Sequence, residues 1–174
     1  QADAPPEQRV TYMGGVPALL EEFTWAWGQM IQYNTEYLCE PGEIIYYDRT
    51  KLSYHAAARN ALADRMRGDW LLMLDTDHAF EPDIVARLLR MLLVHEVEVV
   101  TGLYVYKQPP HNPVVFPRID GKLGYLGDWD RTSEMFEVGS AGAGCLLIRR
   151  RVFDRIHASL AERTGADFSS SNNE

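Results

Sequence analysis

Short β-prone runs alternate with longer segments of helical periodicity between residues 9 and 107, and this alternation limits the fold most. Strand, helix and strand in succession form a unit in which the strands run parallel and the helix packs across them. The alternation therefore predicts an α/β domain with a mainly parallel central sheet flanked by helices. The expected strands are 9–13, 43–47, 70–74 and 97–107, and the expected helices are 16–33, 53–67 and 82–95.

The chain changes character after residue 107, where proline, glycine and short β-prone runs become frequent. Asp120 and Gly121 are typical of a tight hairpin turn, and they lie between the β-prone runs 113–116 and 122–126. We therefore expect a small antiparallel β addition to the parallel part. An apolar run at 145–148 and a helix from 149 to about 163 complete the expected elements.

The apolar run 70–74 ends directly at two carboxylates, Asp75 and Asp77. Ligands in open α/β sheets bind just past the carboxyl ends of such strands. Two converging carboxylates repel each other unless a cation lies between them or one is protonated. Mg²⁺ and Mn²⁺ prefer oxygen ligands of this kind. One interpretation is therefore a metal–diphosphate site, and the other is that the pair only caps the following turn and helix.

Three further residues have both a binding and a structural interpretation. Gly14 follows the first expected strand and either lets the backbone approach a ligand or simply forms a turn. Asp48 follows the second expected strand and either accepts hydrogen bonds from a ribose or base, or caps a turn. Arg59 interrupts an alanine-rich helix and either reaches a phosphate or forms a surface ion pair, for example with Asp64 or Glu43.

Gly139, Gly142 and Gly144 precede the apolar run 145–148. So many small residues indicate close backbone contact with a ligand or a crossing strand. A dinucleotide-binding fingerprint is excluded, because its glycines join a strand to a helix, whereas these precede a strand.

Composition limits the partners and the compartment. The net charge of −8 argues against general affinity for duplex nucleic acid, which requires a cationic surface. Cys39 and Cys145 are far apart and outside any C-x-x-C pair, so we expect buried thiols in a reducing compartment. No apolar run approaches the roughly 18 residues of a membrane span, and no signal peptide is visible. We therefore expect a cytoplasmic protein without a membrane span.

Taken together, several ordered pieces resemble the family 2 glycosyltransferases of the GT-A fold, a Rossmann-like sandwich. The resemblance covers about residues 9 to 155, and the order and spacing of the pieces carry it. The pieces are the strand and glycine turn at 11–15, AARN at 57–60, DTD at 75–77, VVTGLYVYKQPPHNPVVF at 99–116, and GSAGAGCLLIRRRVF at 139–153.

The resemblance implies transfer of a sugar from a nucleotide-diphospho-sugar to an acceptor hydroxyl (a hexosyltransferase-type activity of class EC 2.4), with Mn²⁺ or Mg²⁺. A UDP- or GDP-sugar is the expected donor, and the acceptor is unknown. By position, Asp77 would be a direct metal ligand and Asp75 would lie near the metal or the ribose. The other residues implied at the donor nucleotide are Gly14, Asp48, Arg59 and Thr76, and those implied beside the transferred sugar and acceptor are Gly142, Ala143 and Gly144.

The resemblance also divides the chain. It implies one catalytic domain at 9–174, with a nucleotide-binding half at 9–107 and an acceptor-side half at 108–174. Residues 1–8 are polar and rich in proline, which predicts a flexible arm before this domain. In an inverting reaction a carboxylate deprotonates the acceptor hydroxyl. The family usually carries this base after the glycine-rich strand, so Glu174 is the candidate and the second half is expected to be C-terminally truncated. Asp130, with Asp128 beside it, is a weaker alternative.

Two other functional classes compete with this interpretation. A truncated domain of this kind would also serve as a nucleotide-sugar-binding module without turnover. Phosphatases with an aspartate nucleophile use D-x-D as well, but after the first strand and followed by Gly-Thr, whereas His78 follows here.

Overall fold

The computed structural model describes residues 18–39, 55–75, 77–126 and 135–164. The expected arm 1–8 and the expected strands 9–13 and 43–47 lie outside the described residues. The same holds for the candidate site residues Gly14, Asp48, Thr76, Asp128, Asp130 and Glu174. Their roles remain predictions.

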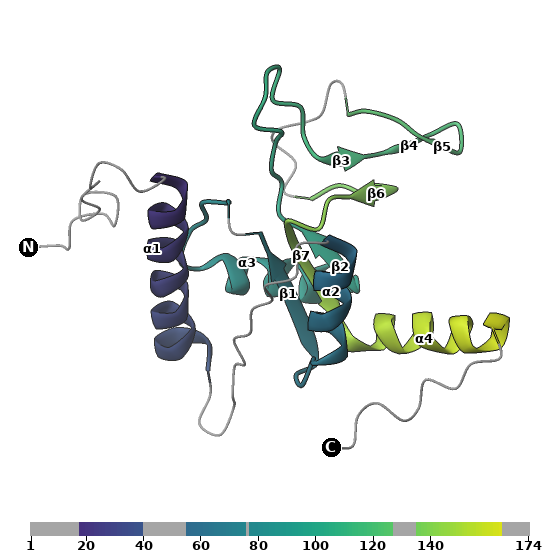
Figure 1. Cartoon of the computed structure of the whole chain (residues 1–174), viewed down its shortest axis with the longest axis horizontal. Coiled ribbons are helices and arrows are strands. Elements are labelled where there is room, and N and C mark those ends of the chain that lie inside the picture. The colour runs from purple at the N-terminus through teal and green to yellow at the C-terminus, as the bar shows by residue number, and fades with distance from the viewer. Residues whose placement is uncertain (1–17, 40–54, 76, 127–134, 165–174) are drawn as a thin grey trace, which may run out of the picture.

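The helices follow the expected periodic segments closely (Figure 1). They are α1 (Ala18–Tyr33), continued by the π-helix η2 (Asn34–Leu38), α2 (His55–Asp64), α3 (Ile84–Val94) and α4 (Arg150–Thr164). The strands are β1 (Trp70–Leu74), β2 (Val99–Thr101), β3 (Val115–Phe116), β4 (Arg118–Ile119), β5 (Lys122–Leu123), β6 (Ser140–Ala141) and β7 (Cys145–Arg149). No helix in the described part of the chain is long and apolar enough to cross a membrane.

The largest sheet has the strand order β1-β7-β2, and β7 pairs antiparallel with both neighbours. Leu146, Leu147 and Ile148 of β7 each pair with both neighbours. Leu147, for example, lies opposite Leu72 of β1 and opposite Val100 of β2. β1 and β2 therefore run parallel to each other but are separated by a strand that comes much later in the chain.

This arrangement tests the expected sheet only in part, because the expected strands 9–13 and 43–47 lie outside the described residues. All strand pairs among the described residues are antiparallel, so a mainly parallel central sheet is not shown there. The local strand–helix–strand alternation predicted parallel neighbours for 70–74. The alternation did not predict that the apolar run 145–148 lies between β1 and β2 in the sheet. Pairing between strands so far apart in the sequence leaves no local pattern. The small antiparallel additions are present as β3–β6 and β4–β5.

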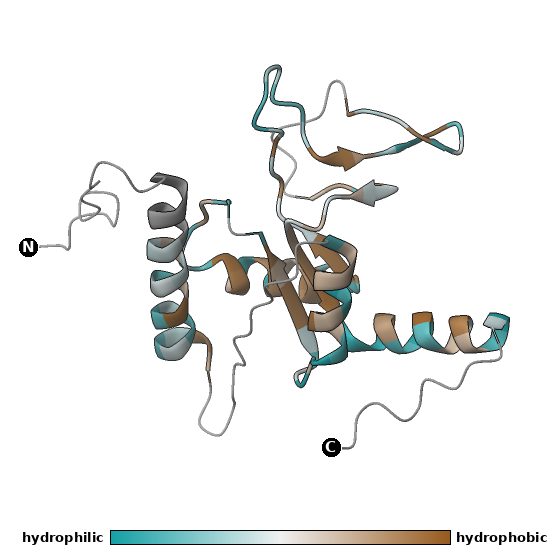
Figure 2. Cartoon of the chain, in the orientation of Figure 1, coloured by the Kyte–Doolittle hydropathy of each residue, from teal (hydrophilic) through white to brown (hydrophobic). Residues whose placement is uncertain are grey.

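The apolar core joins α3 to this sheet. Leu88 and Leu92 of α3 pack with Cys145 and Leu147 of β7 in one buried cluster. Leu92 is 1% and Leu147 2% exposed, and full burial of such a side chain contributes roughly 1.5–3 kcal/mol. Figure 2 shows the apolar colouring of β1, β7 and α3 where they meet. The core therefore anchors the strand end from which the acidic pair emerges.

The expected strand 97–107 is a strand only at Val99–Thr101. At Gly102 an added Cβ would lie 2.7 Å from Cys145 Sγ, so the backbone passes β7 too closely for a side chain. Beyond this point the chain leaves the sheet and doubles back. The Val114 N–H donates to the Tyr104 carbonyl at 2.9 Å, closing a segment that we call the 104–114 loop.

The hairpin turn at Asp120 and Gly121 is confirmed. Their φ angles are 50° and 78°, the left-handed pair that a tight hairpin turn requires. The strands on either side differ from the expectation. β4 pairs with β5, whereas β3 pairs with β6 from the glycine-rich stretch.

Candidate functional site

The acidic pair begins where the β1–β7 ladder ends. The backbone N–H of Asp75 donates to the Gly144 carbonyl at 2.8 Å, next to the Leu74–Cys145 rung. The buried sheet therefore fixes the backbone of Asp75, while its side chain projects beyond the strand. This is the carboxyl end of the strand, as the sequence predicted.

Asp75 is paired with Arg59. One guanidinium nitrogen of Arg59 lies 3.1 Å and 3.2 Å from the two carboxylate oxygens of Asp75. Both side chains are partly buried, at 27% exposure for Arg59 and 40% for Asp75. Arg59 thus joins α2 to the acidic pair, although Asp75 was not among the partners considered from the sequence.

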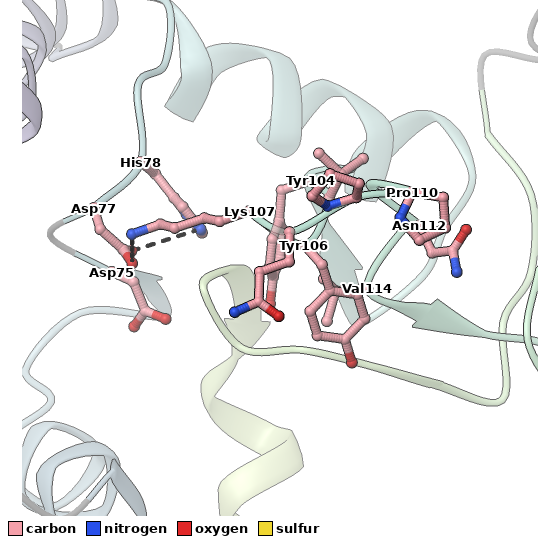
Figure 3. Close-up of a pocket in the computed structure, with 12 residues that line it drawn as sticks. Asp75, Asp77, His78, Tyr104, Tyr106, Lys107, Pro110, Asn112 and Val114 are labelled. Carbon is pink, nitrogen blue, oxygen red and sulfur yellow. Dashed lines mark ion pairs between the residues drawn. The ribbon is translucent and has the colours of Figure 1, made fainter.

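Asp77 has a different cationic partner. The Lys107 ammonium lies 2.6 Å from Asp77 Oδ2, as the dashed line in Figure 3 shows. This hydrogen bond lowers the pKa of Asp77 below its ordinary value, against the opposing effect of burial. Asp77 is therefore ionised at neutral pH, and its carboxylate is 46% exposed.

His78 joins the turn that carries Asp75 and Asp77, which we call the acidic turn, to residues 142–144, which we call the glycine-rich loop. Its Nδ1 lies 3.0 Å from the Gly144 carbonyl oxygen, so Nδ1 carries the hydrogen and Nε2 is left 3.9 Å from Asp77 Oδ1. The ring of Tyr104 lies 4.5 Å from the imidazole, and the Tyr104 hydroxyl accepts a hydrogen bond from the Gly144 N–H at 3.0 Å. Burial raises the pKa of Tyr104, so the phenol stays protonated.

The glycines in this loop are required by close packing, as the sequence indicated. A Cβ on Gly144 would overlap His78 Cε1 and lie 3.1 Å from Asp75 Oδ2. A Cβ on Gly142 would overlap the Tyr104 hydroxyl. Ala143 lies between them and is half-buried. The segments that pack closely against these glycines are therefore the acidic turn and the 104–114 loop.

Asp75, Asp77 and His78 line a pocket of about 480 Å³ together with residues of the 104–114 loop, Lys107 among them (Figure 3). One wall carries Asp75, Asp77 and His78, and the other is the 104–114 loop. The loop is braced by the Tyr106 N–H, which donates to the Asn112 carbonyl at 3.0 Å. A concave space lined by two carboxylates and other polar side chains is typical of a site for a polar ligand.

A larger cavity of about 640 Å³ lies between α1, β1 and α3. Its lining is mainly apolar, with Arg65, Arg67 and Asp69 as its charged members among the described residues. The described residues that line it include no pair of carboxylates, so we place the candidate site in the smaller pocket.

The acidic pair fits a hard divalent cation that takes part of its coordination from a ligand. Mg²⁺ is usually held by one or two carboxylates together with water and substrate phosphates. Asp75 and Asp77 supply two such carboxylates at the pocket. Within the described ranges, no three His, Cys, Asp or Glu side chains converge as a complete ligand set.

Of the described residues predicted from the sequence, the structure brings together Asp75, Asp77, Arg59 and the glycine-rich loop. Sequence reasoning did not identify His78, Tyr104 or Lys107 as site residues. His78 had a usable signal, because it directly follows Asp77. Lys107 ends the β-prone run 97–107, but nothing local shows that it reaches the acidic pair.

The comparison with protein families agrees with the resemblance seen in the sequence. The family model for "Glycosyl transferase family 2" matches residues 29–156, well over half of the 174-residue chain. The matched range contains β1, the acidic pair, the 104–114 loop and β7. Searches among curated proteins and solved structures gave no significant match. The chain is a glycosyltransferase in the general sense and belongs to glycosyl transferase family 2.

Proposed function

We propose that this protein transfers a sugar from a nucleotide-diphospho-sugar, a UDP- or GDP-sugar, to an acceptor hydroxyl with inversion and with a divalent cation. The observation that carries the proposal is the ionised carboxylate of Asp77, which follows β1 closely and lines a pocket together with Asp75. A diphosphate leaving group gains negative charge as the glycosidic bond breaks, so a cation at this point favours the reaction.

Mn²⁺ or Mg²⁺ bound at Asp77 and Asp75 would supply that charge compensation. The chain's own residues would then orient the site. Arg59 holds the Asp75 carboxylate from α2, and His78 holds the acidic turn against Gly144. Gly142, Ala143 and Gly144 are proposed to lie beside the transferred sugar and acceptor.

In the proposed reaction the acceptor oxygen bonds to the anomeric carbon as the bond to the diphosphate oxygen breaks. The electron pair leaves with the diphosphate, and the acceptor's proton goes to a carboxylate base. Glu174 is the proposed base and Asp130 the alternative. Gly14, Asp48 and Thr76 are proposed contacts of the donor nucleotide. The proposed unit is one catalytic domain over residues 9–174.

A thermal-shift screen of UDP-, GDP-, CMP- and dTDP-sugars, with and without Mn²⁺, tests the proposal. We expect one donor class to raise the melting temperature only when Mn²⁺ is present, and Asp77→Asn to abolish the shift. Asp120→Asn is the matched control, because Asn tolerates the positive φ at that exposed turn. Donor binding that persists without metal in Asp77→Asn would overturn the role of Asp77. Absence of a shift with every donor would refute the function.

Binding without turnover is the second candidate, and one observation favours it. Asp75 and Asp77 are the only carboxylates lining the pocket among the described residues, and both are paired with cations. Neither is free to act as a base there. Release of UDP or GDP from nucleotide-sugars across a panel of acceptors separates the two candidates. Tight donor binding with no release in any reaction would favour the binding module.

A further inference from the structure

Lys107 forms an ion pair with Asp77, the same carboxylate that the proposed metal would bind. Its ammonium lies 2.6 Å from Asp77 Oδ2, and Figure 3 shows the side chain reaching from the 104–114 loop to the acidic turn. Asp77 therefore already has a cation, and a divalent cation must compete with Lys107 for it.

The two ion pairs of the site differ in how easily they can open. Arg59 engages both oxygens of Asp75, and both side chains are partly buried. Lys107 is 59% exposed and meets one oxygen of Asp77, which is 46% exposed. An exposed pair of this kind contributes only about 0–1 kcal/mol. Lys107 is thus the cation that can exchange, while Arg59 stays.

The backbone that carries Lys107 is held in place. The Tyr106 N–H donates to the Asn112 carbonyl at 3.0 Å, and His111 Nδ1 lies 2.9 Å from the Tyr106 carbonyl. The flexible four-carbon stem can therefore move its ammonium within the pocket without rearranging the loop. The pocket lining among the described residues offers that ammonium no carboxylate besides Asp75 and Asp77, so a new anionic partner would come from the ligand.

We propose that Lys107 is a displaceable cation: it neutralises Asp77 in the free protein and moves to the donor's diphosphate when a divalent cation takes Asp77. Lysine binds phosphate as a mobile point charge, which suits such an exchange. The inference rests on the proposed function, because it takes the ligand to be a nucleoside diphosphate and the metal to bind Asp77.

The first test measures the Kd of the protein for Mn²⁺ by isothermal titration calorimetry, in the absence of a sugar donor and of turnover. Removing the competing cation in Lys107→Met should lower the Kd for Mn²⁺ about two- to fivefold, the range that an exposed ion pair supports. Lys107→Arg keeps the charge and should resemble the wild type. Lys122→Met, on β5 and outside the pocket lining, is the matched control. An unchanged or raised Kd for Mn²⁺ in Lys107→Met would overturn the inference.

The second test measures the Kd of the protein for UDP and for GDP at saturating Mn²⁺. Loss of the phosphate contact in Lys107→Met should raise the nucleoside diphosphate Kd about tenfold, the size of one charge-assisted hydrogen bond, whereas Lys122→Met should not. An unchanged Kd here would overturn the inference but leave the proposed function standing, provided that binding still requires Mn²⁺ and Asp77. If neither nucleotide binds the wild type, the proposed function and the diphosphate step fail together. The Mn²⁺ titration then still reports whether Lys107 competes at Asp77.

Discussion

The Nδ1 atom of His78 lies 3.0 Å from the carbonyl oxygen of Gly144 and joins the acidic turn after β1 to the residue before β7. The Gly144 N–H is also used, because it donates to the Tyr104 hydroxyl at 3.0 Å. Both polar groups of one glycine thus hold the two walls of the pocket together. The geometry of Asp75 and Asp77 therefore depends on a residue more than sixty positions away.

Gly144→Ala should disrupt this junction. The added methyl overlaps His78 Cε1 and approaches Asp75 Oδ2, so the acidic turn must shift. We expect a loss of about 1–3 kcal/mol in the free energy of unfolding, typical of overpacking, together with loss of Mn²⁺-dependent donor binding. Denaturant unfolding and the thermal-shift screen measure the two effects.

Gly28→Ala is the control for that substitution. Among the described residues, no atom outside the two chain neighbours and the backbone of the helix itself lies within 4 Å of a Cβ at Gly28, which is exposed on α1. Alanine there should stabilise the protein by about 0.5–1 kcal/mol through its helix propensity and leave donor binding unchanged. If Gly144→Ala behaved like Gly28→Ala, the packing assigned to Gly144 would be wrong.

Arg150→Ala should destabilise the connection between α2 and β1. The Arg150 guanidinium donates to the Met66 carbonyl at 3.0 Å and to the Gly68 carbonyl at 2.7 Å and 3.0 Å. Hydrogen bonds to a charged group contribute about 1.5–3 kcal/mol, and partial exposure places the expected loss toward the lower end. Arg163→Ala removes an exposed arginine of the same helix and should have little effect on chemical denaturation. Equal effects from the two variants would contradict the role of Arg150.

Glu98 should make the contact between β2 and α4 pH-dependent. Arg155 Nη1 donates to Glu98 Oε1 at 3.1 Å, and Arg151 pairs with the same carboxylate. These contacts, the Arg155 hydrogen bond above all, lower the pKa of Glu98 below 4.5. Because the lowered pKa belongs to the folded state, the stabilisation is present above the unfolded-state value and is lost as the pH falls through the folded-state value.

Glu98→Gln should therefore lower the melting temperature at pH 7, and the difference from the wild type should shrink as the pH falls below about 4.5, the ordinary value of a glutamate. Melting curves over a pH series, monitored by circular dichroism, measure this. A difference that stayed constant across the series would show that Glu98 contributes by packing and not by its charge.

Cys145 should resist alkylation in the native protein. Its side chain belongs to the buried cluster with Leu88, Leu92 and Leu147, and burial raises the pKa of its thiol. The thiolate is the reactive form, so both effects slow the reaction. Iodoacetamide labelling followed by mass spectrometry should modify Cys39, which is partly exposed, before Cys145. Labelling of Cys145 at the rate found in denaturant would contradict the packing of the core.

Several features could be predicted from the sequence because they depend on residues close together in the chain. The strand at 70–74, the acidic pair directly after it, and the apolar stripe of α3 follow from local hydrophobic periodicity. The turn at Asp120 and Gly121 follows from the φ angles that these residues tolerate. The family resemblance likewise rests on ordered local motifs, and the family model confirms it.

Only the tertiary structure decided which distant groups meet. β7 lies between β1 and β2, so the described sheet is antiparallel although the local alternation predicted parallel neighbours. Arg59 meets Asp75, and Lys107 meets Asp77. Such contacts depend on how the whole core is buried and on the register of strands far apart in the chain, and neither leaves a periodic pattern in one segment. The sequence by itself therefore determined the family and the position of the acidic pair, and the tertiary structure decided which cation neutralises each carboxylate.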